Sequence, residues 1–472
     1  MSEWAVALTL ATPVSTLAPL FSRPPRVLRA LIPLLTGAGL VIFGLVVAVQ
    51  PVAAVGLVVA GIGVATAVTH PQAVGFVSIF ALTLVPVYAA PAAGPLVTHP
   101  SVLAAWLAAG GLLLLVYLGR DTVRLNVVDL AMAGFFGLFA LAVLFESRER
   151  GEYITVVFTT LGPYLAMRLL VPRLDATWLP RAFAAATLAS LPFVLYEAIT
   201  SINLFSSLEF NPVESAVWGE VQNRFGVQRG EGAFGQAISL SQFAGTAMLL
   251  ALGAAVMTRQ AAARRIWMLV IVAGAAMLAL SYSRTGWLIF GSGVVIIALA
   301  VTTGQTRARL LWTLAAVGVL GGLVLYGSGL NESVLRLVND DSLAGSNDFR
   351  EILLRRALRG DGIAFFGLPD SPLGSGIDGA ASSIDNAYLA TAAEWGWAGM
   401  IGLIGVGLAV ASVLWKLRGQ PWALIPAVTL ANFLGLFQVA INTQTKYWLW
   451  MLVGACAGAA VAHTPTTRRI RD

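Results

Sequence analysis

Long apolar runs separated by short polar turns make up most of this 472-residue chain. Each run is roughly 17–25 residues long, which is the length that an α-helix needs to cross the hydrocarbon core of a bilayer. We therefore expect an all-α polytopic transmembrane bundle of about 12–14 spans. The candidate spans are 28–49, 52–69, 72–89, 99–118, 126–145, 153–171, 179–200, 236–257, 265–281, 284–302, 308–328, 388–414, 421–440 and 446–462.

Two long polar segments, 201–235 and 329–387, interrupt this pattern, and the larger one precedes the last three predicted spans. The predicted organisation follows from their positions. It comprises a cytoplasmic or interfacial N-terminus (1–27), N-terminal transmembrane helices (28–200), a core that carries both loops (201–415), and the last transmembrane helices with a cytoplasmic tail (416–472).

The composition agrees with a membrane protein: 58% of the residues are hydrophobic and only 11% are charged, against about 25% charged in soluble domains. The net charge of +6 is interpreted as membrane topology and contact with anionic lipids, and no nucleic-acid partner is expected. Cys456 is the single cysteine, and there are three histidines and no Cys/His cluster. We expect no disulfide, metal or cofactor.

The basic residues predict the orientation. With the N-terminus inside, eighteen of the twenty-nine lysines and arginines fall on the cytoplasmic side, as the positive-inside rule requires. Both termini are then cytoplasmic, and both long polar loops lie outside. The arginines of those loops run against the rule, so a role other than topology is expected for them.

The segment 223–245 carries the first candidate site. Arg224 and Arg229 precede a Gly-rich turn, 230–235, after which an apolar helix begins. An arginine beside a helix start suits an anion, because the guanidinium fork and the free N–H groups of the helix act together. Alternatively, these arginines pair with Glu220 and Glu231.

Arg284 is the second candidate, in the turn SYSRTGW between two apolar runs. An arginine held between two membrane helices is costly, which favours a functional role. Alternatively, its side chain snorkels to the lipid headgroups.

The third candidate is a loop helix, SNDFREILLRRALRGDG. Arg350 lies at its N-terminal end, where a cation does not suit the helix dipole, so it needs an anionic partner. Arg355 and Arg359 lie in the last turn, where dipole compensation explains them, and Arg356 is kept as a substrate-binding candidate.

The fourth candidate begins the last group of helices. Asp385 is either a helix N-cap or a carboxylate general base. Asn386 follows it, and Tyr388 and Glu394 lie on the ensuing helix.

The order of these motifs over about 220–415 resembles the O-antigen ligase and O-antigen polymerase superfamily of bacterial polysaccharide assembly. The matching residues are Arg229, Ser283-Arg284-Thr285-Gly286, Arg350, Pro372, Gly374, Gly376, Asn386-Ala387-Tyr388-Leu389 and Glu394-Trp395-Gly396.

This resemblance implies a metal-independent, inverting, C-type glycosyltransferase in the bacterial cytoplasmic membrane. Its donor is a glycan on a polyprenyl diphosphate, which the arginines hold, and its acceptor is a sugar hydroxyl. Arg284 and Asp385 are the implied catalytic residues, and the other candidates bind substrate. Family ligases carry a histidine where this chain has Asp385, which favours polymerisation of an exopolysaccharide, capsule or O-antigen-like glycan over ligation to a lipid or wall acceptor.

Two other classes stay open. A polysaccharide transporter or flippase of this size has a comparable number of spans, but it usually places ionisable residues in mid-membrane and shows internal repeats. The span centres here are nearly free of charge. A scaffold without activity is the third alternative. Beside donor, acceptor and membrane lipids, the expected partners are a flippase and a chain-length regulator.

Overall fold

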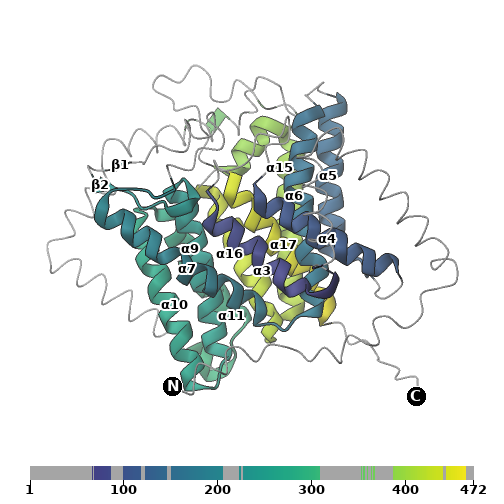
Figure 1. Cartoon of the computed structure of the whole chain (residues 1–472). Helices are drawn as coiled ribbons and strands as arrows, with labels where there is room; N and C mark the ends of the chain where they lie inside the picture. The colour runs from purple at the N-terminus through teal and green to yellow at the C-terminus, as the bar shows by residue number, and fades with distance from the viewer. Residues whose placement is uncertain are drawn as a thin grey trace, which may run out of the picture. The chain divides into compact units, whose positions relative to one another are not determined.

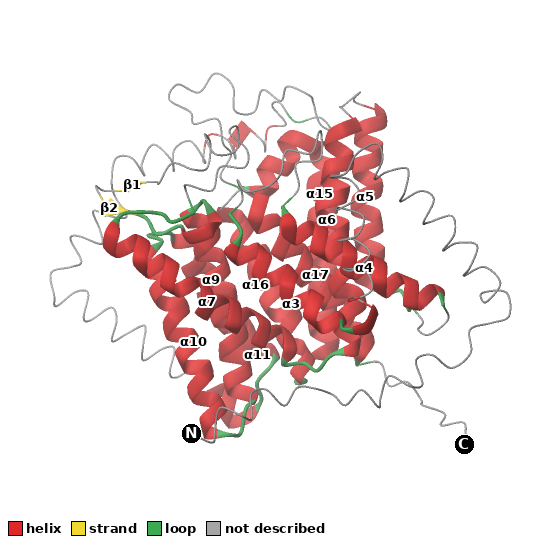
Figure 2. Cartoon of the chain, in the orientation of Figure 1, coloured by secondary structure: helices red, strands yellow, loops and turns green. Residues whose placement is uncertain are grey.

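The structure is a computed structural model, and it describes residues 66, 68–86, 99–118, 123–145, 150–205, 223–224, 227–308, 352, 355–356, 359, 363, 365–366, 386–438 and 443–463. All of them belong to one compact unit, Val64–Asp472. Within these ranges the fold is helical apart from a two-residue antiparallel ladder, in which β1 (Asn223–Arg224) pairs with β2 (Val227–Gln228) (Figure 2). The α-helices are α3 (Pro71–Leu84), α4 (Pro100–Tyr117), α5 (Val127–Phe145), α6 (Arg150–Leu170), α7 (Trp178–Thr200), α9 (Ala237–Met257), α10 (Ala261–Leu280), α11 (Arg284–Ala300), α15 (Ala387–Leu417), α16 (Leu424–Gly435) and α17 (Thr443–Ala462).

Every one of these helices coincides with a span predicted from the apolar runs, so the all-α membrane bundle is confirmed. Seven of the described helices are long and apolar enough to cross a bilayer, and four more are shorter apolar helices. The predicted span 28–49, all but the first residue of 308–328, and most of 52–69 lie outside the described residues, as does the N-terminal segment 1–27. The predicted domain boundaries and the total span count stay predictions.

The helices alternate in direction, so their ends gather at two opposite ends of the bundle (Figure 1). At one end, the His99 side chain, before α4, forms a hydrogen bond with the Val85 carbonyl, after α3, and stacks on the Tyr447 ring of α17. At the same end, the Asn386 side chain, before α15, donates a hydrogen bond to the Phe437 carbonyl, after α16. Helix α11 begins at this end with Arg284, and we therefore call it the Arg284 end. At the other end, the starts of α5 and α7 lie beside the ends of α6 and α17. We call it the Asp129 end.

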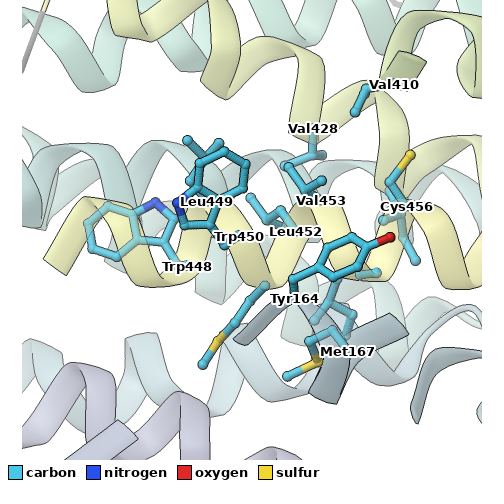
Figure 3. Close-up of a cluster of buried hydrophobic side chains, with 14 of the residues drawn as sticks. Tyr164, Met167, Val410, Val428, Trp448, Leu449, Trp450, Leu452, Val453 and Cys456 are labelled. Atoms are coloured by element: carbon cyan, nitrogen blue, oxygen red, sulfur yellow. The ribbon is translucent and has the colours of Figure 1, made fainter. Parts of the chain in front are cut away.

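Small residues let several helices approach each other closely. A Cβ on Gly286 of α11 would lie 2.2 Å from the Ser241 carbonyl of α9, and one on Gly454 of α17 would lie 2.1 Å from the Tyr164 carbonyl of α6. Such contacts suit membrane bundles, where packing and interhelical hydrogen bonds hold helices together. Figure 3 shows the surrounding core, in which Tyr164 and Met167 lie against α17.

Helix α15 is broken at Gly396, whose φ of 72° and ψ of −177° are confined to glycine. Past the break, the Ala398 N–H donates to the Phe365 carbonyl at 2.8 Å instead of to its own helix. The single predicted span 388–414 is therefore wrong in one respect: a short helix, 387–395, precedes a second piece, 397–417. The second piece is about 31 Å long at 1.5 Å per residue, enough to cross the membrane.

A buried ion pair closes the Asp129 end. Arg168 of α6 donates from Nε and Nη2 to the two carboxylate oxygens of Asp129 at 2.8 and 2.9 Å, and the Tyr164 hydroxyl donates to the same carboxylate at 2.5 Å. Asn126 adds a bond from its side-chain amide to the Ala457 carbonyl at 3.0 Å. Arg168 is thus a structural residue that joins α5 to α6.

Candidate functional site

The predicted site residues are described to different extents. Arg229, Arg284, Arg356, Asn386, Tyr388 and Glu394 are described, and Arg224 is described as a residue of strand β1. Asp385 and Arg350 lie outside the described residues, as do Pro372, Gly374 and Gly376 of the same loop.

The first two motifs meet directly. The Gly230 N–H donates to the Leu280 carbonyl at 2.9 Å, and Nε of Arg229 donates to the Ser281 carbonyl at 3.0 Å. Arg229 is buried. The loop before α9 is therefore fastened to the end of α10, a contact between residues about fifty positions apart that sequence alone does not indicate.

The turn that carries Arg284 is strained and tightly held. Tyr282 has a φ of 48°, a left-handed conformation that is uncommon outside glycine and is often found at functional sites. The hydroxyl oxygens of Ser283 and Ser241 lie 2.9 Å apart, within hydrogen-bonding distance. The backbone at this turn is thereby fixed against helix α9.

Helix α11 begins at Arg284, which is exposed and forms no ion pair with any residue in the described ranges. Ser283 is the N-cap, but its hydroxyl makes no capping bond to the helix. The first N–H groups of α11 thus lack a side-chain cap next to an exposed guanidinium. Both features attract an anion.

Glu197, which the sequence analysis did not single out, belongs to the same assembly. It lies in the last turn of α7, and its Oε2 accepts the N–H groups of Glu231 and Gly232 at 3.0 and 2.7 Å. Its Oε1 accepts the amide of Asn203 at 3.1 Å, and the same amide donates to the Gly232 carbonyl at 3.0 Å. The available signal was a lone carboxylate at the end of an apolar run, which is costly without partners.

The fourth motif starts helix α15, and its N-cap is Asn386. The Asn386 Oδ1 accepts the N–H groups of Tyr388 and Leu389 at 3.0 and 3.1 Å, and its Nδ2 donates to the Phe437 carbonyl at 3.3 Å. The hypothesis that Asp385 caps this helix is therefore wrong, because the capping bonds come from the next residue. The Tyr388 hydroxyl is buried and donates to the Phe433 carbonyl at 2.9 Å.

The third motif lies against the fourth. Residues 352, 355, 356 and 359 are helical, with Arg356 half-buried and Arg355 and Arg359 exposed. Just after them, Ile363 is buried with Leu389, Ala392 and Ala393 of α15. Glu394, the residue after Ala393, is exposed. The chain after the arginine helix is therefore docked on the broken helix.

Helix α16 connects the two halves of the site. Its Gly435 faces α11 so closely that a Cβ there would lie 2.5 Å from Cγ1 of Ile289. The same end of α16, with the turn that follows, carries Phe433 and Phe437, which bond Tyr388 and Asn386. The Arg284 turn and the start of α15 thus lie at the same end of the bundle, on either side of α16.

Histidine 99 is accounted for by the fold. Its Nδ1 accepts the Ser101 N–H at 3.2 Å, and its Nε2 lies 2.9 Å from the Val85 carbonyl, to which it donates. Burial lowers the pKa of His99 to about 4, which outweighs the opposite effect of the Val85 carbonyl. His99 is therefore a neutral N-cap of α4. The described ranges contain no cluster of three or more His, Cys, Asp or Glu residues suited to a metal ion.

No protein-family model matches this chain, and no curated protein is significantly similar to it.

Proposed function

We propose that this chain is a glycosyltransferase of the bacterial cytoplasmic membrane, of the O-antigen ligase and polymerase type. It transfers an oligosaccharide from a polyprenyl diphosphate to a sugar hydroxyl at the outer face, in the polymerisation of an exopolysaccharide, capsule or O-antigen-like glycan. The observation that carries the proposal is the gathering of the Arg229 loop, the Arg284 turn and the start of α15 at one end of the bundle.

Arg284 is the proposed ligand of the donor diphosphate. Its guanidinium is exposed beside helix N–H groups that lack a side-chain cap, and a planar fork suits phosphate oxygens better than a point charge does. Negative charge grows on the diphosphate as the anomeric bond breaks, so a fixed cation there stabilises the transition state. Arg350 is proposed as a further contact because it matches the family motif, and Arg224 and Arg356 are proposed because they are arginines of the same two loop motifs.

Arg229 has a different proposed part from that of Arg284. Because its guanidinium is buried and donates to the Ser281 carbonyl, it holds the Arg284 turn in place in addition to any contact with the donor. Its loss would move the turn as well as remove a positive charge.

Asp385 is the proposed general base. It takes the proton of the acceptor hydroxyl while the hydroxyl oxygen forms its bond to the anomeric carbon and the bond to the diphosphate oxygen breaks, with inversion. Since Asn386 supplies the cap of α15, capping does not require the Asp385 carboxylate. The Tyr388 hydroxyl, in contrast, already donates its hydrogen bond to the Phe433 carbonyl.

The transporter alternative has one feature in its favour, the buried ion pair of Asp129 and Arg168. This pair lies near the ends of α5 and α6, and the carboxylate is closed by Tyr164 and by the Asn126 N–H at 2.8 Å. A closed network of this kind suits the joining of helices better than the passage of a substrate.

The purified protein should be tested with a glycan on a polyprenyl diphosphate, an acceptor glycan, and EDTA. Chain extension that persists with EDTA supports a metal-independent transferase. Absence of transfer, together with movement of the lipid-linked glycan across proteoliposome membranes, would establish the flippase alternative instead.

The proposed orientation has its own test, in a Cys456→Ser background. Ile202→Cys lies at the Arg284 end and Gln260→Cys at the opposite end, and both side chains are exposed. An impermeant thiol reagent should label Ile202→Cys in intact cells and Gln260→Cys only after lysis. The reverse pattern would place the site inside the cell and rule out the proposed reaction.

A further inference from the structure

Glu197 is a buried carboxylate, and two of its three hydrogen bonds come from the loop that carries Arg229. Its side chain is 1% exposed, and it accepts from Glu231, Gly232 and Asn203. No cation of the described ranges pairs with it. Only backbone and amide N–H groups therefore hold its charge.

Such a group is costly in a membrane helix, because a carboxylate removed from water needs compensating partners. Helix α7 does not need it for its own ending, since Ser201 at a φ of 60° supplies the left-handed cap and bonds back to the Glu197 carbonyl. The carboxylate instead orders the chain about thirty residues further on. Its partners Glu231 and Gly232 immediately follow the residues that bind α10.

A continuous series of contacts leads from Glu197 to Arg284. The carboxylate accepts a hydrogen bond from the Gly232 N–H. Two residues earlier in the same loop, Gly230 and Arg229 donate hydrogen bonds to the Leu280 and Ser281 carbonyls at the end of α10. The turn that follows Ser281 leads directly into α11, which begins at Arg284. We infer that Glu197 is a positioning residue, which sets the location of Arg284 against the donor diphosphate without touching the donor itself. This inference rests on the proposed function.

The substitution Glu197→Gln tests the inference with almost no change in volume. Both carboxylate oxygens are acceptors here, Oε1 for the Asn203 amide and Oε2 for two backbone N–H groups. A glutamine has one oxygen, so its amide must face a donor in either orientation. Asn203→Ala removes the other partner of the Gly232 backbone and should act in the same direction.

Asp129→Asn is the matched control, because Asp129 is a carboxylate of the opposite end, only 10% exposed, whose hydrogen bonds are also weakened by the change. It should lower the melting temperature and leave the Arg284 turn in place. Comparison with Glu197→Gln separates positioning of the turn from general loss of stability.

Two measurements are required on purified protein in detergent. Tryptic cleavage after Arg229, identified by mass spectrometry, reports release of the loop and needs no substrate. It should accelerate about tenfold or more in Glu197→Gln, the scale of one lost hydrogen bond to a charged group, and should not change in Asp129→Asn. Transfer kinetics should show a fall of at least about tenfold in kcat/KM for the lipid-diphosphate donor, with an unchanged KM for the acceptor.

Three results would overturn the inference: equal cleavage after Arg229 in Glu197→Gln and wild type, equal kinetic losses in Glu197→Gln and Asp129→Asn, or a changed acceptor KM. A wild-type protein that transfers no glycan would refute the proposed function instead, and the cleavage result would then still decide whether Glu197 holds the loop.

Discussion

Replacement of Gly286 by alanine should separate two helices at the Arg284 turn. An ideal Cβ at Gly286 would lie 2.2 Å from the Ser241 carbonyl oxygen and 2.4 Å from Cδ1 of Leu278. The first distance is about 1.2 Å short of the 3.4 Å at which ordinary contact begins. Because the obstacle is backbone, no change of rotamer in α9 relieves it, and α9 and α11 must move apart.

The size of the effect follows from that displacement. Overpacking a close helix contact costs about 1–3 kcal/mol, so the protein should fold with a lower melting temperature. A shift of about 1 Å at a catalytic group can cost about 10²-fold in rate. Arg284 is two residues from the new methyl group, and we expect a loss of glycan transfer on that scale.

Two further alanine variants make the comparison decisive. At Gly291, on the same helix, a Cβ meets nothing within 4 Å, so Gly291→Ala should keep activity and gain up to about 1 kcal/mol of helix propensity. At Gly454 a Cβ would lie 2.1 Å from the Tyr164 carbonyl, between α6 and α17. Gly454→Ala should therefore lower stability without the specific loss of transfer.

Thermal unfolding followed by the fluorescence of the 13 tryptophans and glycan transfer on the folded fraction measure the two effects. Equal melting temperature and activity in Gly286→Ala and Gly291→Ala would show that α9 and α11 do not touch at this point, and the rigid mounting of Arg284 would be refuted.

Three other outcomes are expected. Arg284→Lys should lower transfer by about 10²-fold or more with folded protein retained, because the charge stays but the fork for phosphate is lost; near-normal polymer would indicate a snorkelling role. Asp385→Asn should abolish transfer and leave donor binding intact, with donor binding measured as the rise in melting temperature that the donor causes. Full activity of this variant would remove Asp385 from the mechanism and make Glu394 the next carboxylate to test. The pKa of His99 falls from its ordinary 6.5 to about 4 on folding, so the unfolded chain binds the proton more strongly. The stabilisation by neutral His99 is complete above about pH 6.5 and is lost as the pH falls towards 4. His99→Gln should flatten that dependence, and His463→Gln, at an exposed site, should not.

Apolar length was enough to predict the described helices, because a membrane leaves few alternatives to a helix of that length. It did not predict the break in α15. Apart from Glu394, the sequence is apolar on both sides of Gly396, and the unusual backbone angles there accompany a hydrogen bond from Ala398 to the carbonyl of Phe365, thirty-three positions away in the chain. Local periodicity in the sequence cannot predict a hydrogen-bond partner that lies so far away in the chain.

The candidate site shows the same division. Sequence order identified the Arg229 and Arg284 motifs, yet the bond that joins them spans 52 positions. The sequence offered Asp385 as the cap of α15, because an aspartate suits that position, but the capping hydrogen bonds go to the side chain of Asn386. The role of Glu197 could not be predicted, because a single carboxylate in an apolar run indicates that compensating hydrogen bonds are needed but not which residues supply them.

The bond from Ala398 to the Phe365 carbonyl has a consequence for engineering. A membrane helix with a missing backbone partner is unstable in lipid, and here the partner is supplied by the long loop that precedes the helix. The loop is therefore not an interchangeable module. A chimaera that takes its loop from another polytopic protein must keep the chain around Phe365 together with α15, with the junction placed before Ile363. A junction between 366 and 386 would leave the break at Gly396 without its acceptor and should yield a protein that fails to assemble.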